Sequence, residues 1–267
     1  MGELNQIQAM IIDLDGVLWL GDTPLPGVVD LFNLLHRKSI QYILATNNAT
    51  ADPNSVCNRL ATLGVNVEPD RILTSGQASA QFLQLQLPQG ALVYTIGESA
   101  LRKALTQVGF TLTDAADGAQ AVVVGLDRQL SWNTMAEAAL AIQAGAIFIG
   151  TNPDVSLPIE RGQVPGVGAT LAALKAATGV QPTIVGKPEP HLYLQALQRL
   201  DAEPERTLVL GDRLETDILG GQHAGMVTCL VLTGVTQRQD LVDSSIQPDY
   251  VFEDLPQLCR ALVGEMP

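Results

Sequence analysis

The stretch that decides the fold is Ile11-Ile12-Asp13-Leu14-Asp15-Gly16-Val17-Leu18, near the start of the chain. The apolar run at residues 8–12 predicts a buried β-strand, and Gly16 predicts that the chain turns soon after it. Two carboxylates beside a core strand are costly unless a cation offsets their charge. We therefore interpret Asp13 and Asp15 as functional residues rather than as acids that cap an ordinary loop.

Short apolar runs alternate with helix-like stretches along the rest of the chain. Val29, Phe32 and Leu35 stand at helical spacing and predict a helix within residues 26–39, and a strand is predicted directly after it at residues 40–45. Further strands are predicted at residues 91–96, 121–124, 146–149, 182–185, 207–210 and 228–232, and helices at residues 52–64, 134–144, 167–177 and 191–200. This alternation predicts an α/β fold with a mainly parallel sheet covered by helices.

Polar side chains follow four of the predicted strands: Asp13, Thr46, Lys187 and Asp212. Ligands of open parallel sheets bind at the carboxyl ends of the strands. We therefore expect an acid, a hydroxyl, an amine and a second acid to meet at one edge of the sheet.

The middle of the chain carries none of these strand-end residues, yet it has its own pattern of strands and helices. It is long enough to fold semi-independently. We predict a core made of residues 1–82 and 182–267, with an inserted α/β domain at residues 83–181.

Two of the strand-end motifs are ambiguous when each is taken alone. Thr46-Asn47-Asn48 offers a hydroxyl and amides that suit phosphate oxygens, but it is also common turn chemistry. In Val185-Gly186-Lys187-Pro188, the proline disfavours a helical conformation at Lys187. The lysine is then presented from a strand end, and the alternative is an ordinary solvated lysine.

The last motif, Gly211-Asp212-Arg213-Leu214-Glu215-Thr216-Asp217, holds two acids at the end of an apolar run. Carboxylates together with water are the ligands that Mg²⁺ prefers. We predict that Asp212 meets a cation and that Asp217 supports it, although Asp217 also fits the first turn of a helix, where the dipole favours an acid.

Composition and charge narrow the class of protein. With 15 Lys plus Arg against 28 Asp plus Glu, the formal charge of −13 makes nucleic acids and anionic membranes poor partners. A phosphate site in such a chain must supply positive charge locally. Cys57, Cys229 and Cys259 form no C-x-x-C pair, which favours reduced thiols and a cytoplasmic location. No leader and no membrane span are predicted.

The four motifs, in this order, resemble the haloacid dehalogenase (HAD) superfamily of phosphotransferases. The resemblance runs from Ile11 to about Leu255 and is closest to the group of NagD, 4-nitrophenyl phosphatase, and the pyridoxal phosphate and phosphoglycolate phosphatases. Thr151-Asn152-Pro153-Asp154 resembles part of the group's cap domain, and Ala49 departs from a common Ser. The resemblance implies a Rossmann-like core with an inserted α/β cap that selects the substrate.

The resemblance also implies roles in hydrolysis of small phosphate monoesters. Asp13 would be the nucleophile that forms a phosphoaspartate, and Asp15 the general acid and base. Magnesium would be bound by the Asp13 carboxylate, the Asp15 backbone carbonyl and Asp212, with Asp217 in support.

The remaining implied roles concern the phosphate. Thr46, Asn47 and Asn48 would hold the phosphoryl oxygens, and Lys187 would neutralise charge on the nucleophile and the transferring group. A mutase that uses the same phosphoaspartate, and a sensor that binds a phosphate ligand without turnover, stay open as alternatives. Members of the group are often dimers, so a homodimer is a further expectation. The choice among phosphoglycolate, pyridoxal phosphate, sugar and nucleotide monophosphates stays open.

Overall fold

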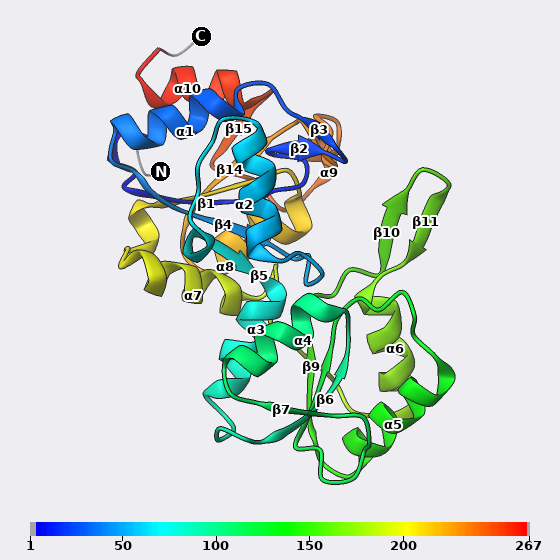
Figure 1. The fold of residues 1–267 in the computed structure, drawn as a ribbon. Helices are drawn as coiled ribbons and strands as arrows, with labels where there is room; N and C mark the ends of the chain where they lie inside the picture. The colour runs from blue at the N-terminus through cyan, green and yellow to red at the C-terminus, as the bar shows by residue number, and fades with distance from the viewer. Residues whose placement is uncertain (1–3, 266–267) are drawn as a thin grey trace. The chain divides into compact units, whose positions relative to one another are not determined.

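The chain folds into two compact units (Figure 1). The computed structural model describes residues 4–265. Residues 1–3 and 266–267 lie outside the described residues. The prediction that the chain has no leader concerns residues 1–3 in part. The first unit comprises Met1–Thr46, Pro53–Leu73 and Lys187–Pro267, and the second comprises Asn47–Asp52 and Thr74–Gly186.

The chain passes from one unit to the other at residues that differ from the boundaries predicted from the sequence. The predicted boundary at 82/83 falls within helix α3 (Ser75–Gln84), and the one at 181/182 precedes strand β12 (Thr183–Ile184), which belongs to the second unit. Selection of the substrate by the second unit stays a prediction.

A six-stranded sheet forms the centre of the first unit, in the order β15-β14-β13-β1-β4-β5. Its strands are β1 (Ala9–Ile12), β4 (Gln41–Thr46), β5 (Ile72–Thr74), β13 (Thr207–Gly211), β14 (Val227–Val231) and β15 (Tyr250–Phe252). Strand β1 runs parallel to both β13 and β4, and every residue of β1 and β13 is buried, as expected for a sheet covered on both faces. The predicted α/β fold with a mainly parallel sheet is confirmed.

Strand order brings the predicted polar residues together. The chain leaves β1 in the direction of β4 and β5, and it returns on the other side of β1 through β13, β14 and β15. Ile12 stands level with Leu210 on β13 and with Leu44 on β4. The carboxyl ends of three neighbouring strands therefore present Asp13, Thr46 and Asp212 at a switch point in strand order, where ligands of such sheets bind.

Helices of the first unit pack against this sheet and against one another. Helix α7 packs against β1 and β4, and α1 packs against α10. The helices of the first unit are α1 (Val28–Arg37), α2 (Pro53–Thr62), α7 (Pro190–Leu200), α8 (Leu219–His223), α9 (Asp240–Asp243) and α10 (Leu255–Leu262), with single turns η1 (Leu4–Gln6), η2 (Pro69–Arg71), η3 (Pro204–Arg206) and η4 (Leu214–Ile218). A small antiparallel pair, β2 (Trp19–Leu20) and β3 (Thr23–Pro24), follows the first motif.

The second unit is built on its own sheet, in the order β12-β9-β8-β6-β7, with parallel pairing throughout. Its other elements are β6 (Leu92–Ile96), β7 (Thr111–Thr113), β8 (Ala121–Val124), β9 (Ile147–Gly150), α3, α4 (Ser99–Gln107), α5 (Trp132–Gln143) and α6 (Val167–Thr178). Residues of β6, β8, α5 and α6 share one apolar core, and the hairpin of β10 (Ser156–Ile159) and β11 (Gly162–Pro165) projects from this unit (Figure 1).

One expectation about the sheet is wrong. The strand before Lys187 was expected to share a sheet with the strands before Asp13 and Asp212. Strand β12 instead pairs with β9 of the second unit, and the chain enters the first unit only at Lys187. The apolar run at residues 182–185 is short, and a short run carries no information about which sheet it joins.

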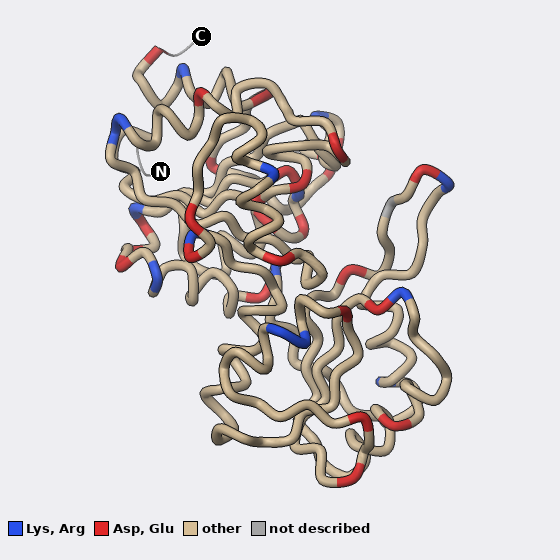
Figure 2. Tube along the Cα trace, in the orientation of Figure 1, with Lys and Arg blue, Asp and Glu red and all other residues tan. Residues whose placement is uncertain are grey.

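Charge is spread over the molecule. Figure 2 shows acidic positions in both units, and the net charge of the chain is −13. Within the described residues, no helix has the length and apolar character needed to cross a membrane.

Candidate active site

Three carboxylates converge at the carboxyl edge of the first sheet. One oxygen from each of Asp13, Asp212 and Asp217 lies within 4.8 Å of the others. Asp13 follows β1, and its backbone N–H donates to the carbonyl of Leu210 at 2.9 Å, which continues the ladder with β13. Asp212 directly follows the end of β13. The same edge of the sheet thus supplies both strand-end acids.

The ammonium group of Lys187 lies between two of these acids. Its Nζ donates to Asp13 Oδ1 at 2.6 Å, to Asp217 Oδ1 at 2.7 Å and to the carbonyl of Ala45 at 3.3 Å. The side chains of Lys187, Asp13 and Asp217 are 4%, 12% and 2% exposed. Lys187 is therefore not the solvated lysine of the alternative interpretation.

Burial and charge shift the pKa values of the cluster. Burial raises the pKa of Asp13 well above its usual range; Lys187 opposes the shift, and the other two acids add to it. Burial alone would lower the pKa of Lys187, but the carboxylates of Asp13 and Asp217 outweigh it and hold that pKa well above its usual range. Burial, followed by the charge of Asp217, raises the pKa of Asp212 to about 6. Asp13 and Asp212 therefore bind protons more readily than free carboxyl groups do.

Asp212 is held by a loop that the sequence analysis did not single out. The N–H of Val235 donates to Asp212 Oδ2 at 2.7 Å, and Thr233 Oγ1 donates to the carbonyl of Gly16 at 2.6 Å. A side chain at Gly16 or at Gly234 would overlap the Asp212 carboxylate. The loop Thr233-Gly234-Val235-Thr236 comes directly after the strand predicted at residues 228–232. Since functional groups gather at the carboxyl ends of parallel strands, its position in the sequence could have indicated it.

Asp217 sits on a π-helical turn, η4. Its Oδ2 accepts from the N–H of Arg213 at 3.2 Å and from Thr216 Oγ1 at 3.4 Å. The hydroxyl of Tyr193, a fully buried residue of α7, donates to the carbonyl of Asp217 at 3.3 Å. Turns of this kind are rare and often occur at functional sites. Their wider spacing is not visible in the sequence, and neither is the contact of Tyr193.

Asp15 is not a member of the three-acid cluster. Its carboxylate is outside the group of Asp13, Asp212 and Asp217, and its Oδ1 accepts a hydrogen bond from Trp19 Nε1 at 2.9 Å. Trp19 lies directly after the first sequence motif and is not part of it. The two acids of the first motif therefore occupy different environments: the side chain of Asp13 is 12% exposed and lies beside an ammonium group, whereas Asp15 is exposed and lies beside an indole N–H.

The second motif is divided between the units. Thr46 ends β4 and is buried, whereas Asn47 and Asn48 belong to the second unit. Within that unit the carbonyl of Asn47 accepts from Ser75 Oγ at 2.6 Å and from Asn152 Nδ2 at 2.8 Å. Asn48 Oδ1 accepts from the N–H and the hydroxyl of Thr50 at 2.9 and 2.7 Å, so turn chemistry accounts for this side chain.

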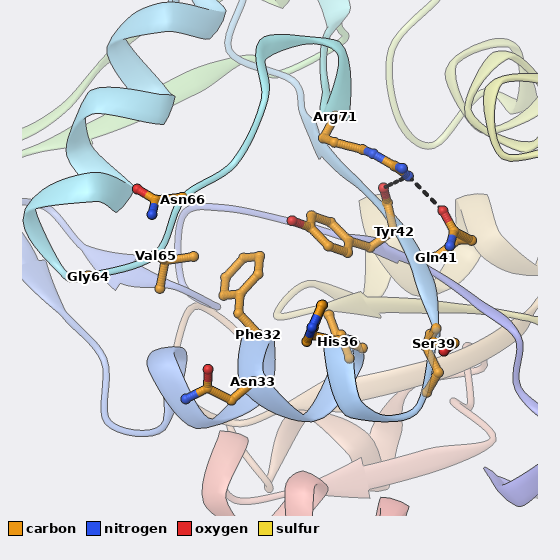
Figure 3. Close-up of a pocket in the computed structure, with 12 residues that line it drawn as sticks. Phe32, Asn33, His36, Ser39, Gln41, Tyr42, Gly64, Val65, Asn66 and Arg71 are labelled. Carbon is orange, nitrogen blue, oxygen red and sulfur yellow. Dashed lines mark hydrogen bonds between the residues drawn. The ribbon is translucent and has the colours of Figure 1, made fainter.

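A cavity of about 430 Å³ lies elsewhere in the first unit (Figure 3). Figure 3 shows Phe32 and His36 of α1 facing Tyr42, with Arg71 bound to Gln41 and to the Tyr42 carbonyl. Tyr42 is at the beginning of β4, whereas Thr46 ends that strand. The cavity includes none of the residues proposed from the sequence.

The donor set suits a divalent cation. Three carboxylates and one ammonium group carry a formal charge of −3 + 1 = −2. Among the described residues, Asp13 and Asp212 each keep one carboxylate oxygen without a protein hydrogen-bond donor. Hard oxygen ligands on a buried, negatively charged cluster are the features that bind magnesium or calcium ions.

Comparison with family models agrees with this arrangement. Residues 10–111 match the model described as haloacid dehalogenase-like hydrolase, and residues 184–258 match the one described as HAD-hydrolase-like. The chain belongs to the haloacid dehalogenase-like hydrolases. Both matched segments contain acids of the cluster.

Relatives with named activities extend the comparison. The acid sugar phosphatase of Staphylococcus saprophyticus is 38% identical over 97% of this chain and 99% of its own length. The structure of p-nitrophenyl phosphatase from Archaeoglobus fulgidus superposes with a TM-score of 0.91 at 35% identity, covering 96% of this chain and 99% of the other. Glycerol phosphate phosphatase of Mycobacterium tuberculosis, solved in complex with magnesium, has a TM-score of 0.87 at 38% identity, covering 98% and 78%.

These relatives place this HAD hydrolase in the NagD group. It is a phosphatase, a hydrolase of phosphoric monoesters. The first unit holds every acid of the cluster and Lys187.

Proposed function

We propose that this HAD phosphatase hydrolyses small phosphate monoesters in a magnesium-dependent reaction, through a phosphoaspartate on Asp13. The observation that carries the proposal is the contact of 2.6 Å between Asp13 Oδ1 and Lys187 Nζ at the edge of a three-carboxylate cluster. The second oxygen of Asp13 has no protein donor among the described residues, which leaves it available for attack on phosphorus.

In the first step, an oxygen of Asp13 attacks phosphorus in line as the bond from phosphorus to the leaving oxygen breaks. Lys187 holds the other oxygen and offsets the charge that accumulates on the transferring group. A dry environment strengthens this interaction, since the ammonium group is almost completely buried.

Asp15 acts as general acid and then as general base. Its proton passes to the leaving oxygen in the first step. The Asp15 carboxylate then takes a proton from the water that attacks phosphorus, and the phosphoaspartate returns to a free Asp13 carboxylate and inorganic phosphate. The separate environments of the two acids suit this division of labour.

Asp13, Asp212 and the Asp15 backbone carbonyl would hold the magnesium ion, with Asp217 in support. When bound, the ion supplies positive charge that offsets repulsion between the nucleophile and the phosphate dianion. Thr46, Asn47 and Asn48 are proposed to hold phosphoryl oxygens. Glycerol, sugar and aryl phosphates are the first substrates to test, because relatives are named for them.

The test is phosphate release from 4-nitrophenyl phosphate by the wild type and by Asp13→Asn, with magnesium and with excess chelator. We expect turnover that requires magnesium and is abolished by Asp13→Asn, together with free phosphate as the product. An isomeric phosphate ester as the product would favour a mutase. Release that persists in Asp13→Asn would refute the phosphoaspartate.

A further inference from the structure

The indole of Trp19 is the partner of the Asp15 carboxylate. Trp19 Nε1 donates to Asp15 Oδ1 at 2.9 Å, and it is the only hydrogen-bond donor to that carboxylate among the described residues. Trp19 is 3% exposed, whereas Asp15 is exposed. A rigid, buried donor therefore restrains a carboxylate that otherwise faces solvent.

The backbone fixes where the indole lies. The N–H of Gly16 donates to the carbonyl of Trp19 at 2.7 Å, which closes the loop of the first motif. Trp19 then begins the antiparallel pair β2–β3, opposite Pro24. Both residues of the Asp15–Trp19 contact thus belong to one short, hydrogen-bonded segment.

Arg59 of α2 fixes the ring from outside this segment. Its guanidinium carbon lies 4.0 Å from the centre of the Trp19 ring, and its Nη2 donates to the carbonyl of Gly21. A guanidinium group over the face of an indole is attracted to the ring electrons and restrains the ring. Arg59 therefore joins α2 to both the ring and the turn of the β2–β3 pair.

The chemistry of the indole suits the task of Asp15. An indole N–H donates and never accepts, so it cannot compete for a proton that the carboxyl group carries. It engages one oxygen and leaves the other free to face the leaving group. Proton transfer depends strongly on such placement, since small displacements of a reacting group cost large factors in rate.

We propose that Trp19, held by Arg59, is a positioning residue that aims Asp15 at the leaving oxygen and so determines how poor a leaving group the enzyme can expel. This inference rests on the proposed role of Asp15 as general acid. It assigns a function to Trp19 and Arg59, which lie outside the acid cluster and outside the four sequence motifs.

The test uses Trp19→Phe, which keeps an aromatic ring and removes the N–H donor, with three substrates of similar shape. These are 4-nitrophenyl, phenyl and benzyl phosphate, whose leaving groups depend increasingly on protonation. We compare kcat/KM, because that ratio reports only the steps up to release of the alcohol. The expected loss in Trp19→Phe is less than twofold for 4-nitrophenyl phosphate and about tenfold for benzyl phosphate.

Arg59→Met keeps Trp19 and tests the support of the ring. We expect the same trend with a smaller loss, about twofold to fivefold for benzyl phosphate. Trp132→Phe is the matched control: Trp132 is the only other tryptophan, it is 80% exposed on α5, and its replacement is expected to change none of the three values.

Asp15→Asn separates the inference from the proposed function. A steep dependence on leaving group in Asp15→Asn supports the general-acid role itself, and its absence would overturn that role whatever Trp19 does. If Asp15→Asn shows that dependence, two results would overturn positioning by Trp19. One is an equal loss on all three substrates in both Trp19→Phe and Arg59→Met. The other is no loss on any substrate in both variants. If Trp19→Phe fails to fold, Arg59→Met alone decides.

Discussion

Replacement of Lys187 by Met tests the electrostatic account of the cluster most directly. The methionine side chain has a volume similar to that of the lysine stem but lacks the ammonium group that contacts Asp13 at 2.6 Å and Asp217 at 2.7 Å. Both acids are largely buried and would then lack their cation. Removal of one partner from a buried ion pair typically destabilises a protein by about 3–5 kcal/mol, and we expect a loss of free energy of unfolding in this range without metal.

Urea unfolding followed by tryptophan fluorescence measures this loss. The Trp132→Phe background is used for every variant, so that the signal comes from Trp19 in the same unit as the cluster. Lys175→Met, an exposed position on α6, is the control and is expected to change the free energy of unfolding by less than about 0.5 kcal/mol. Magnesium is expected to restore part of the loss. A loss below about 1 kcal/mol for Lys187→Met in chelator would refute the reasoning, because that is the value of an exposed pair.

Two further predictions concern Asp212. Because its pKa is raised from 3.8 to about 6, the folded protein without metal keeps a proton there that the unfolded chain releases. This proton adds to the free energy of unfolding fully below about pH 4, and the contribution of about 3 kcal/mol is lost as the pH rises to about 6. The Asp212→Asn variant should not show this pH-dependent loss. Urea unfolding in chelator between pH 4 and 7 checks this, and equal slopes for both proteins would contradict it. Gly234→Ala places a methyl group on the Asp212 carboxylate, so magnesium affinity measured by calorimetry should fall by about tenfold or more. Unchanged affinity would show that the loop accommodates the methyl group.

The sequence predicts the parts of the site that depend on local pattern. Asp13, Thr46 and Asp212 were expected at one edge because each follows an apolar run, and parallel strands bring such ends together. The same rule placed Lys187 at this edge, and Lys187 does contact Asp13, but the strand before Lys187 belongs to another sheet, so the reason given for that placement does not hold. Gly16 predicts a turn, but the sequence does not show that its N–H bonds to the carbonyl of Trp19, which brings the indole to Asp15. Tertiary placement, rather than local preference, decides these contacts.

The charge of the cluster explains why the chain combines an acidic surface with a phosphate substrate. A molecule with a formal charge of −13 repels a phosphate dianion at long range, and the cluster, at −2, repels it at short range as well. One divalent cation would bring the cluster to neutrality and remove the local repulsion. Lys187 cannot do so alone, because two carboxylates already share its charge. The acids that create the need for a cation are thus the ones proposed to hold it. Gly16 and Gly234 leave room for the Asp212 carboxylate, because a side chain at either position would overlap it.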